Sequence, residues 1–579
     1  NLGADVTTLK LGKSSAIDGG AVALGYAADS DSDVTLTVGS TSSSSDPAVA
    51  ITALTVSGNA GALTINSSGD ATNLIGQGVA GTAITANSAS DLSLVGVDRA
   101  LTVLSNKNDA ATISATGASA VTIDATAKGV SATNNDVGGA LGADESLSTL
   151  TVTSNAGDAT LGDVALASGA GAVDLTVTAT AAGTKDTALG GLVVDGFEDK
   201  AVSVSVDAEA SSSGSVTLSG GTVTLAAANA GTTLAGDLKF TTKGTGAIST
   251  DQVYVFDSAD NKAMTVSLTA ETTGRGAIDL NAGGGALDLV GETSTGAVTA
   301  TVDLTATDGS ITTGDILVDS NTKGSTAGFT LTSVAGDITI DRIVLDDASA
   351  ATNLKSTFAV DAAADTTITV TDLSSDGDGA DSSQLSEMTF SGAGTVDIDG
   401  SDMVNTANSV IDASAMTGAL TLDLSGSTGN LDVTLGDTTG TNTLTTGSGG
   451  DVVVGGSGAD VISTGAGVDD ITAGAGADDV DTGAGADVAD GGAGNDTLTS
   501  GGGSDELTGG AGSDTFQATV DFGTTGIDIT DFVSGSDGLE LSSAGTYLAS
   551  TTVGTKSSTT TTGLALAGGF GVATFTGSK

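Results

Sequence analysis

The chain has 579 residues, with 16 Lys+Arg against 71 Asp+Glu and a formal net charge of −55. Because phosphate contacts need basic side chains, this charge excludes nucleic acid as a natural partner and disfavours anionic membrane surfaces. The absence of cysteine and histidine excludes disulfides, zinc fingers, catalytic cysteines and histidine-dependent triads.

Aromatic residues make up 2% of the chain and hydrophobic residues 39%, chiefly Ala, Val, Leu and Ile. A slim solenoid core, one or two side chains wide, needs little aromatic bulk. No apolar run approaches the ~18 residues of a membrane-spanning helix, so we expect no membrane insertion. The first residues, NLGADVTTLKLG, lack the basic head and apolar run of a signal peptide.

Residues 1–400 are predicted to form a β-rich, solenoid-like body of one or more subdomains. Short alternating runs are separated by Gly, Asn, Asp, Ser and Thr, which form turns. The expected strands include 34–38, 51–56, 62–65, 101–104, 120–123, 148–153, 202–208, 216–225, 264–270, 277–280, 286–290, 336–345 and 366–373. Loop-like insertions are expected at 29–35, 41–47, 133–147, 251–262 and 374–386.

Two architectures fit this body. A parallel β-helix or β-solenoid is favoured by the small side chains, the Thr, Ser and Asn content and the low aromatic content. A string of β-sandwich domains would usually carry a core Trp or Tyr in each domain of about 100 residues. The whole chain has no tryptophan and only three tyrosines, which argues against the sandwich. Residues 401–445 continue the alternation and are predicted to be transition coils into the next region.

Residues 446–517 consist of eight nine-residue units in perfect phase, from TGSGGDVVV to GGAGSDTFQ. The eighth position is apolar throughout, with only Ala489 undersized. The sixth position is always aspartate: Asp451, Asp460, Asp469, Asp478, Asp487, Asp496, Asp505 and Asp514. The second and fourth positions are always glycine: Gly447, Gly449, Gly456, Gly458, Gly465, Gly467, Gly474, Gly476, Gly483, Gly485, Gly492, Gly494, Gly501, Gly503, Gly510 and Gly512.

This unit predicts a tight glycine turn followed by a three-residue strand with one inward side chain. Two units close a coil of 18 residues, so alternate aspartates stack about 4.8 Å apart on two edges. Bare carboxylates at that spacing repel, and Ca²⁺, which takes six to eight oxygens, removes the repulsion. We therefore predict several bound calcium ions, held by the eight aspartate side chains and by the backbone of the glycine turns, and a roll that folds only with calcium.

The pattern resembles the RTX family of secreted bacterial proteins. The resemblance implies an all-β protein: a solenoid body that continues into a calcium-bound parallel β-roll with a small β cap. Residues 518–579 would contain that cap, where IDITDFVSGSDGLELS is similar to the segment that ends RTX rolls, and an uncleaved type I secretion signal. Five of the eleven phenylalanines lie at 516–575 and are expected to form a small core there.

The acidic, cysteine-free composition together with the repeats also resembles Gram-negative surface-layer (S-layer) proteins. This resemblance implies a structural, non-enzymatic subunit at the bacterial cell surface, whose calcium-driven assembly joins copies of itself. Cell-surface polysaccharide or lipopolysaccharide is a further candidate partner. A fibre is an alternative geometry, because a head-to-tail interface that does not close yields a filament.

Two other functions are less favoured. An RTX adhesin would show tandem, nearly identical domains of about 100 residues, and no such period is visible. An RTX protease or lipase needs histidine, and a polysaccharide lyase needs clustered basic residues, whereas Arg99, Arg275 and Arg342 are widely separated.

Overall fold

In a computed structural model, the chain divides into two compact units, residues 1–321 and 322–579. All of its described regular structure is β-strand, and none of the described residues forms a helix that could cross a membrane. Side chains are described for residues 176–190, 203–218, 235–251, 264–281, 287, 297–318, 325–345, 354–375, 385–437, 440–518, 527–533 and 535–540, and the remaining strands by their backbone alone.

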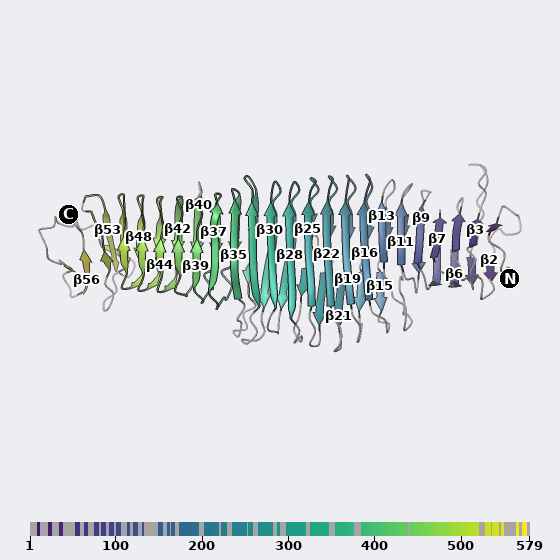
Figure 1. Cartoon of the computed structure of the whole chain (residues 1–579), viewed down its shortest axis with the longest axis horizontal. Coiled ribbons are helices and arrows are strands. Elements are labelled where there is room, and N and C mark those ends of the chain that lie inside the picture. Colours follow the sequence, from purple (N-terminus) through teal and green to yellow (C-terminus); the bar gives the residue numbers. More distant parts are fainter. Residues whose placement is uncertain are drawn as a thin grey trace. The chain divides into compact units, whose positions relative to one another are not determined.

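In the first unit, successive strands of each series lie side by side and pair in parallel (Figure 1). One series runs through β1 (Thr8–Leu11), β3 (Val34–Val38), β5 (Leu63–Ser67), β7 (Ala83–Ser88), β9 (Ala100–Ser105), β11 (Ala120–Ala125), β13 (Thr149–Ser154), β16 (Val173–Ala181), β19 (Val202–Ala210), β22 (Leu234–Thr242), β25 (Met264–Thr272) and β28 (Val298–Ala306).

A second series of strands, short except for β29, follows the first across a turn. It contains β12 (Val130–Ala132), β14 (Ala159–Leu161), β17 (Thr187–Leu189), β20 (Val216–Leu218), β23 (Ile248–Thr250), β26 (Ile278–Asp279) and β29 (Ile311–Asp319). The other strands pair as β2 (Ala21–Gly25) with β4 (Ala53–Ser57) and β15 (Val164–Ala167) with β18 (Leu192–Asp195). Strand β8 (Leu92–Val97) lies between β6 (Leu74–Val79) and β10 (Ile113–Ala115), and β24 (Val253–Ser258) lies between β21 (Thr222–Ala227) and β27 (Ala286–Leu289).

The second unit has two parallel series. One contains β30 (Thr326–Ser333), β32 (Lys355–Ala362), β35 (Gln384–Gly392), β37 (Ser409–Met416), β39 (Leu431–Thr434), β41 (Val452–Val454), β44 (Asp470–Thr472), β47 (Val488–Asp490), β50 (Glu506–Thr508), β52 (Asp528–Ile529) and β56 (Phe570–Phe575). The other contains β31 (Ile338–Asp346), β33 (Thr367–Val370), β36 (Thr395–Asp399), β38 (Leu420–Asp423), β40 (Thr441–Thr445), β42 (Ala459–Ser463), β45 (Asp479–Asp481), β48 (Thr497–Ser500), β51 (Thr515–Thr519) and β53 (Gly538–Ser543), with β34 (Leu373–Ser374) paired to β31.

Parallel pairing between successive coils confirms the solenoid and excludes the β-sandwich, whose sheets are antiparallel. The alternating runs are confirmed as strands, although the runs expected at 216–225 and 366–373 each divide into two, β20 with β21 and β33 with β34. The loop expected at 251–262 is a wrong prediction in part, because it contains β24, where Tyr254 and Val255 pair in register with Leu287 and Asp288. The insertions at 41–47 and 133–147 lie outside the described residues.

The core is a stack of inward side chains that alternate with outward ones. Strand β25 shows the pattern over nine residues: Met264 is buried, and so is every second residue from there to Thr272. In the second unit, Phe329 and Phe358 stack with their ring centroids 4.6 Å apart. In the nonapeptide region, β41, β44, β45, β47 and β50 are three-residue strands with one buried side chain, as predicted.

The coils of the second unit shorten along the chain. Hydrogen bonds between neighbouring coils join residues 30 apart at Asp337, 22 apart at Asn442, 20 apart at Asp451 and 18 apart at Asp469. The shortening removes the loops that long coils carry, so the two edges of the 18-residue coils are tight turns.

The C-terminal segment contains antiparallel pairings of β53 with β54 (Thr546–Leu548) and of β55 (Gly563–Leu566) with β56. The rings of Phe516 and Phe532 lie 6.2 Å apart, which is part of the small aromatic core that was expected. Side chains at the other phenylalanines of this segment lie outside the described residues. The nonapeptide turns add three two-residue strands: β43 (Ala466–Gly467), β46 (Ala484–Gly485) and β49 (Gly502–Gly503).

Candidate metal centre

Left-handed glycines shape the turns of the 18-residue coils. At the second position of the unit, φ is +77° at Gly465, +106° at Gly474, +70° at Gly483 and +92° at Gly492. A side chain in this conformation costs roughly 1–2 kcal/mol, whereas glycine adopts it freely. At Gly447, Gly456 and Gly501, which have no positive φ, an added Cβ would instead collide with a carbonyl oxygen of the preceding coil. Glycine at this position therefore follows either from the positive φ or from the close contact.

Close backbone contact explains glycine at the fourth position. A Cβ added to Gly476 would collide with the carbonyl oxygen of Gly458, and one added to Gly494 would collide with that of Gly476. The same collision occurs at Gly512 against Gly494. Carbonyl oxygens of this position are therefore stacked along each edge, where they can serve as ligands of a hard cation.

The eight aspartates form two buried columns. Each side chain is between 0% and 2% exposed. Within a column, the backbone N–H of one aspartate donates to Oδ1 of the aspartate 18 residues later, at 2.8 Å for Asp451 to Asp469 and 2.8 Å for Asp460 to Asp478. The columns are Asp451, Asp469, Asp487 and Asp505 on one edge, and Asp460, Asp478, Asp496 and Asp514 on the other.

The second carboxylate oxygen is unsatisfied in most of these side chains. Oδ2 is buried and has no partner in hydrogen-bond geometry in Asp451, Asp469, Asp478, Asp487 and Asp496. The nearby hydroxyls of Thr446, Thr464 and Thr482 still lower the pKa of Asp451, Asp469 and Asp487, but less than burial raises it. An isolated buried carboxylate costs several kcal/mol, so these oxygens require a cation or a proton.

Burial dominates the electrostatics of the columns. Desolvation, assisted by the charges of neighbouring aspartates in the column and opposed by backbone hydrogen bonds, raises the pKa of Asp478 and of Asp487 to about 6. Desolvation also raises the pKa of Asp451, Asp460, Asp469, Asp496 and Asp514. At neutral pH the columns therefore hold ionised carboxylates at a desolvation cost, which a compensating positive charge would remove.

The donor set fits a hard divalent cation. Among the side chains that the structure describes, no three acidic groups converge on one point. An ion at these edges would therefore be held by one or two carboxylates together with turn carbonyls, which is a ligand set that calcium accepts.

A family model described as the RTX calcium-binding nonapeptide repeat (4 copies) matches residues 445–480 and again residues 481–516. Residues 445–516 are RTX repeats. Such repeats bind calcium ions in a β-roll, and the positive charge of the ions neutralises the buried carboxylates. No curated protein and no solved structure matches the chain.

The structure brings together the aspartates and glycines of the RTX repeats at the two edges, in the order that the nine-residue period predicts. Ligation of calcium by each individual side chain stays a prediction. The sequence reasoning did not identify a chemical difference between the two edges, although alternation of the first residue of each unit signals it. On the Asp451 edge that residue is Thr446, Thr464, Thr482 or Ser500, and on the Asp460 edge it is Gly455, Ala473, Gly491 or Gly509.

The hydroxyls of the Asp451 edge contribute their own hydrogen bonds. Thr446 Oγ1 donates to the carbonyl oxygen of Thr464 at 3.0 Å, and the Ser500 hydroxyl donates to Oδ2 of Asp505. On the other edge, Oδ2 of Asp460 instead accepts a backbone N–H, that of Gly456, at 3.1 Å.

Two aspartates beyond the repeats close the C-terminal end. Asp537 Oδ1 accepts the N–H of Asp514 at 3.2 Å, and its Oδ2 accepts that of Val533 at 2.7 Å. The Asp531 carboxylate accepts the N–H groups of Gly509 and Gly510 at 2.9 and 2.7 Å. The expected cap therefore docks through carboxylate–amide hydrogen bonds, and Asp537 continues the Asp460 column out of phase with the nonapeptides.

Proposed function

We propose that this chain is a structural subunit of a calcium-dependent assembly outside the cell, and that the assembly is a bacterial surface layer of identical copies. The RTX repeats mark a calcium-binding secreted protein. Calcium abundant outside the cell would fold the roll after export and then join folded subunits. The proposal includes no catalytic role.

One outward column of the second unit carries the proposal. Seven exposed residues stand in register across successive strands, and carboxylate alternates with valine at every step. The order is Glu387, Val410, Asp432, Val452, Asp470, Val488 and Glu506.

The alternation has a physical consequence for contact between copies. Neighbouring strands are about 4.8 Å apart, so the carboxylates recur about every 10 Å and each is flanked by an apolar side chain. Val410, Val452 and Val488 are 49%, 43% and 45% exposed, which leaves apolar surface to bury. Two acidic columns repel each other without cations, whereas divalent cations between them would permit contact and bury the valines.

The test combines microscopy with a matched pair of variants. In calcium, electron micrographs of the purified chain should show ordered sheets, and chelator should disperse them to monomers. Val452→Asp with Val488→Asp should prevent assembly while calcium still orders the roll, as followed by circular dichroism. Val334→Asp is the control, because this valine is 49% exposed but lies outside the column.

The outcomes test both the assembly itself and its geometry. Sheets that form equally well in the double variant, or no assembly in the parent chain at any calcium concentration, would overturn the proposal. Filaments that require calcium would retain the subunit role but replace the layer with a fibre.

A further inference from the structure

The buried aspartate columns end abruptly on their N-terminal side. On the Asp460 edge, the next coil carries Asn442, which stands in register with Asp460 and is 1% exposed. It occupies the place that an aspartate would take if the column continued by one more coil. An asparagine has nearly the shape of aspartate but carries no charge and adds two N–H donors.

The contacts of Asn442 show how it replaces both a ligand and an ion. Its Nδ2 donates to Oδ1 of Asp460 at 2.9 Å, and its Oδ1 accepts the N–H of Leu420 at 3.3 Å. A further donation from Nδ2 reaches the carbonyl oxygen of Gly436 at 3.5 Å. All polar atoms of this side chain are therefore satisfied by protein groups.

The other edge ends in a neutral network. Asn405, Ser409 and Ser427 are each 1–2% exposed, in the coils that precede Asp451. Asn405 Nδ2 donates to Ser409 Oγ at 2.9 Å and to the carbonyl oxygen of Ala407 at 3.1 Å, and Ser427 Oγ donates to the carbonyl oxygen of Asn405 at 3.3 Å.

The two sides of this boundary differ in how their buried polar groups are satisfied. In the described residues 385–437 and 440–450, every buried side-chain oxygen or nitrogen has a hydrogen-bond partner, whereas five aspartate Oδ2 atoms between 451 and 496 have none. Unsatisfied aspartate oxygens therefore begin at Asp451 on one edge and at Asp478 on the other, because Asn442 and the N–H of Gly456 satisfy both oxygens of Asp460.

We propose that Asn442, together with the Asn405–Ser409–Ser427 network, is a built boundary that makes the coils before residue 446 independent of calcium. These coils then present β39 and β40 as a preformed edge on which the roll winds when calcium arrives. Asn442 determines where the ion column on its edge begins. The inference rests on calcium binding by the RTX repeats and does not depend on assembly of subunits.

Hydrogen exchange of the full chain, followed by mass spectrometry of its peptides, tests the boundary. In chelator, amides of 420–445 should exchange slowly while those of 446–517 exchange rapidly, and calcium should slow only the second group. Equal, rapid exchange of both segments in chelator would overturn the proposal.

Asn442→Asp sharpens the test, because it places an unpaired buried carboxylate beside Asp460. In chelator the protection of 420–445 should fall roughly tenfold or more, and in calcium it should return with additional bound calcium per chain, measured by atomic emission after dialysis. Asn430→Asp is the matched control. It adds the same charge at an exposed residue whose Oδ1 accepts the N–H of Gly450 and which lies outside the column.

The variants separate the boundary from a general effect of charge. Loss of protection in Asn442→Asp but not in Asn430→Asp supports the proposal. Equal behaviour of the two variants, or unchanged protection and calcium content in Asn442→Asp, would overturn it. Failure of the chain to form sheets would leave these outcomes unaffected, because all of them are measured on dispersed monomers.

Discussion

The turns at one edge of residues 181–309 and the turns of the roll satisfy their buried polar groups by different chemistry. In the first, buried hydroxyls satisfy the glycine turns: Thr242 Oγ1 donates to the carbonyl oxygen of Gly276 at 2.9 Å, and Thr272 Oγ1 to that of Gly309 at 2.7 Å. In the roll, buried carboxylates stack instead. Hydroxyls can therefore satisfy the turns of stacked parallel coils, and we expect calcium dependence to be a local property of the aspartate turns.

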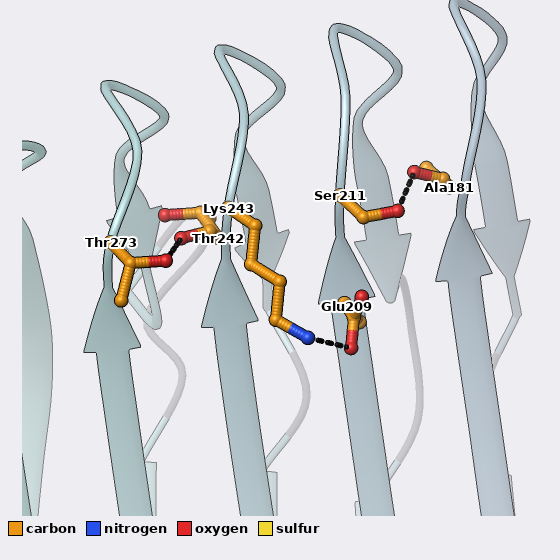
Figure 2. Close-up of polar contacts among 6 residues, drawn as sticks. All are labelled: Ala181, Glu209, Ser211, Thr242, Lys243 and Thr273. Carbon is orange, nitrogen blue, oxygen red and sulfur yellow. Dashed lines mark hydrogen bonds and ion pairs between the residues drawn. The ribbon is translucent and has the colours of Figure 1, made fainter.

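One ion pair at the first edge remains partly exposed. Figure 2 shows Lys243 reaching from its turn to Glu209 of the preceding coil, with Nζ and Oε2 2.8 Å apart, beside the Ser211 and Thr273 hydroxyls that donate to the carbonyl oxygens of Ala181 and Thr242. Such exposed pairs contribute little, whereas the buried columns of the roll are costly until they are neutralised.

Removal of calcium should produce the largest difference between the two regions. Chelator should unfold residues 446–517 and leave the coils of residues 176–318 folded, because among the residues whose side chains the structure describes only the roll buries columns of carboxylates. Differential scanning calorimetry should show one calcium-dependent transition and one that chelator does not move. Loss of both transitions in chelator would show that calcium dependence is not local.

A glycine substitution should have the next largest effect. Gly494→Ala places a Cβ against the carbonyl oxygen of Gly476, so we expect a loss of about 3 kcal/mol or more in the calcium-bound state. Gly502→Ala is the control, since a Cβ there meets nothing within 4 Å. Denaturant titration in saturating calcium measures both, and equal losses would contradict the close approach.

Low pH should partly replace calcium in stabilising the folded roll. Burial raises the pKa of Asp478 and Asp487 to about 6, so the folded calcium-free roll binds protons that the unfolded chain releases near its ordinary value of 3.8. This contribution to stability is complete below pH ~4 and is lost as the pH rises through ~6, at most about 3 kcal/mol for each group. In chelator, circular dichroism should show a more stable roll at pH 4 than at pH 7, and the opposite trend would contradict the burial of these carboxylates.

The smallest effect is expected at the exposed ion pair. Lys243→Ala removes a contact with Glu209 whose two side chains are 51% and 30% exposed. Exposed pairs contribute about 0–1 kcal/mol and are screened by salt. Thermal unfolding should therefore shift by a few degrees at most, with no change in the calcium-dependent transition.

Local chemistry explains why the sequence by itself determined the roll. Each nonapeptide contains its own glycine turn, aspartate and inward apolar residue, so a period of nine residues is enough to predict two aspartate columns and their glycines. The alternating runs before residue 446 likewise determined strands, because period-two burial is a property of each strand alone.

Only the tertiary structure decided which residues stand in register where the coil length is not constant. Val410 pairs with Asp432 and Asp432 with Val452, at separations that no fixed period predicts. Asp537 joins the Asp460 column 23 residues after Asp514 for the same reason. Satisfaction of a buried oxygen depends on neighbours one coil away, so the unpaired aspartate oxygens and the neutral boundary at Asn442 became visible only when the coils were stacked.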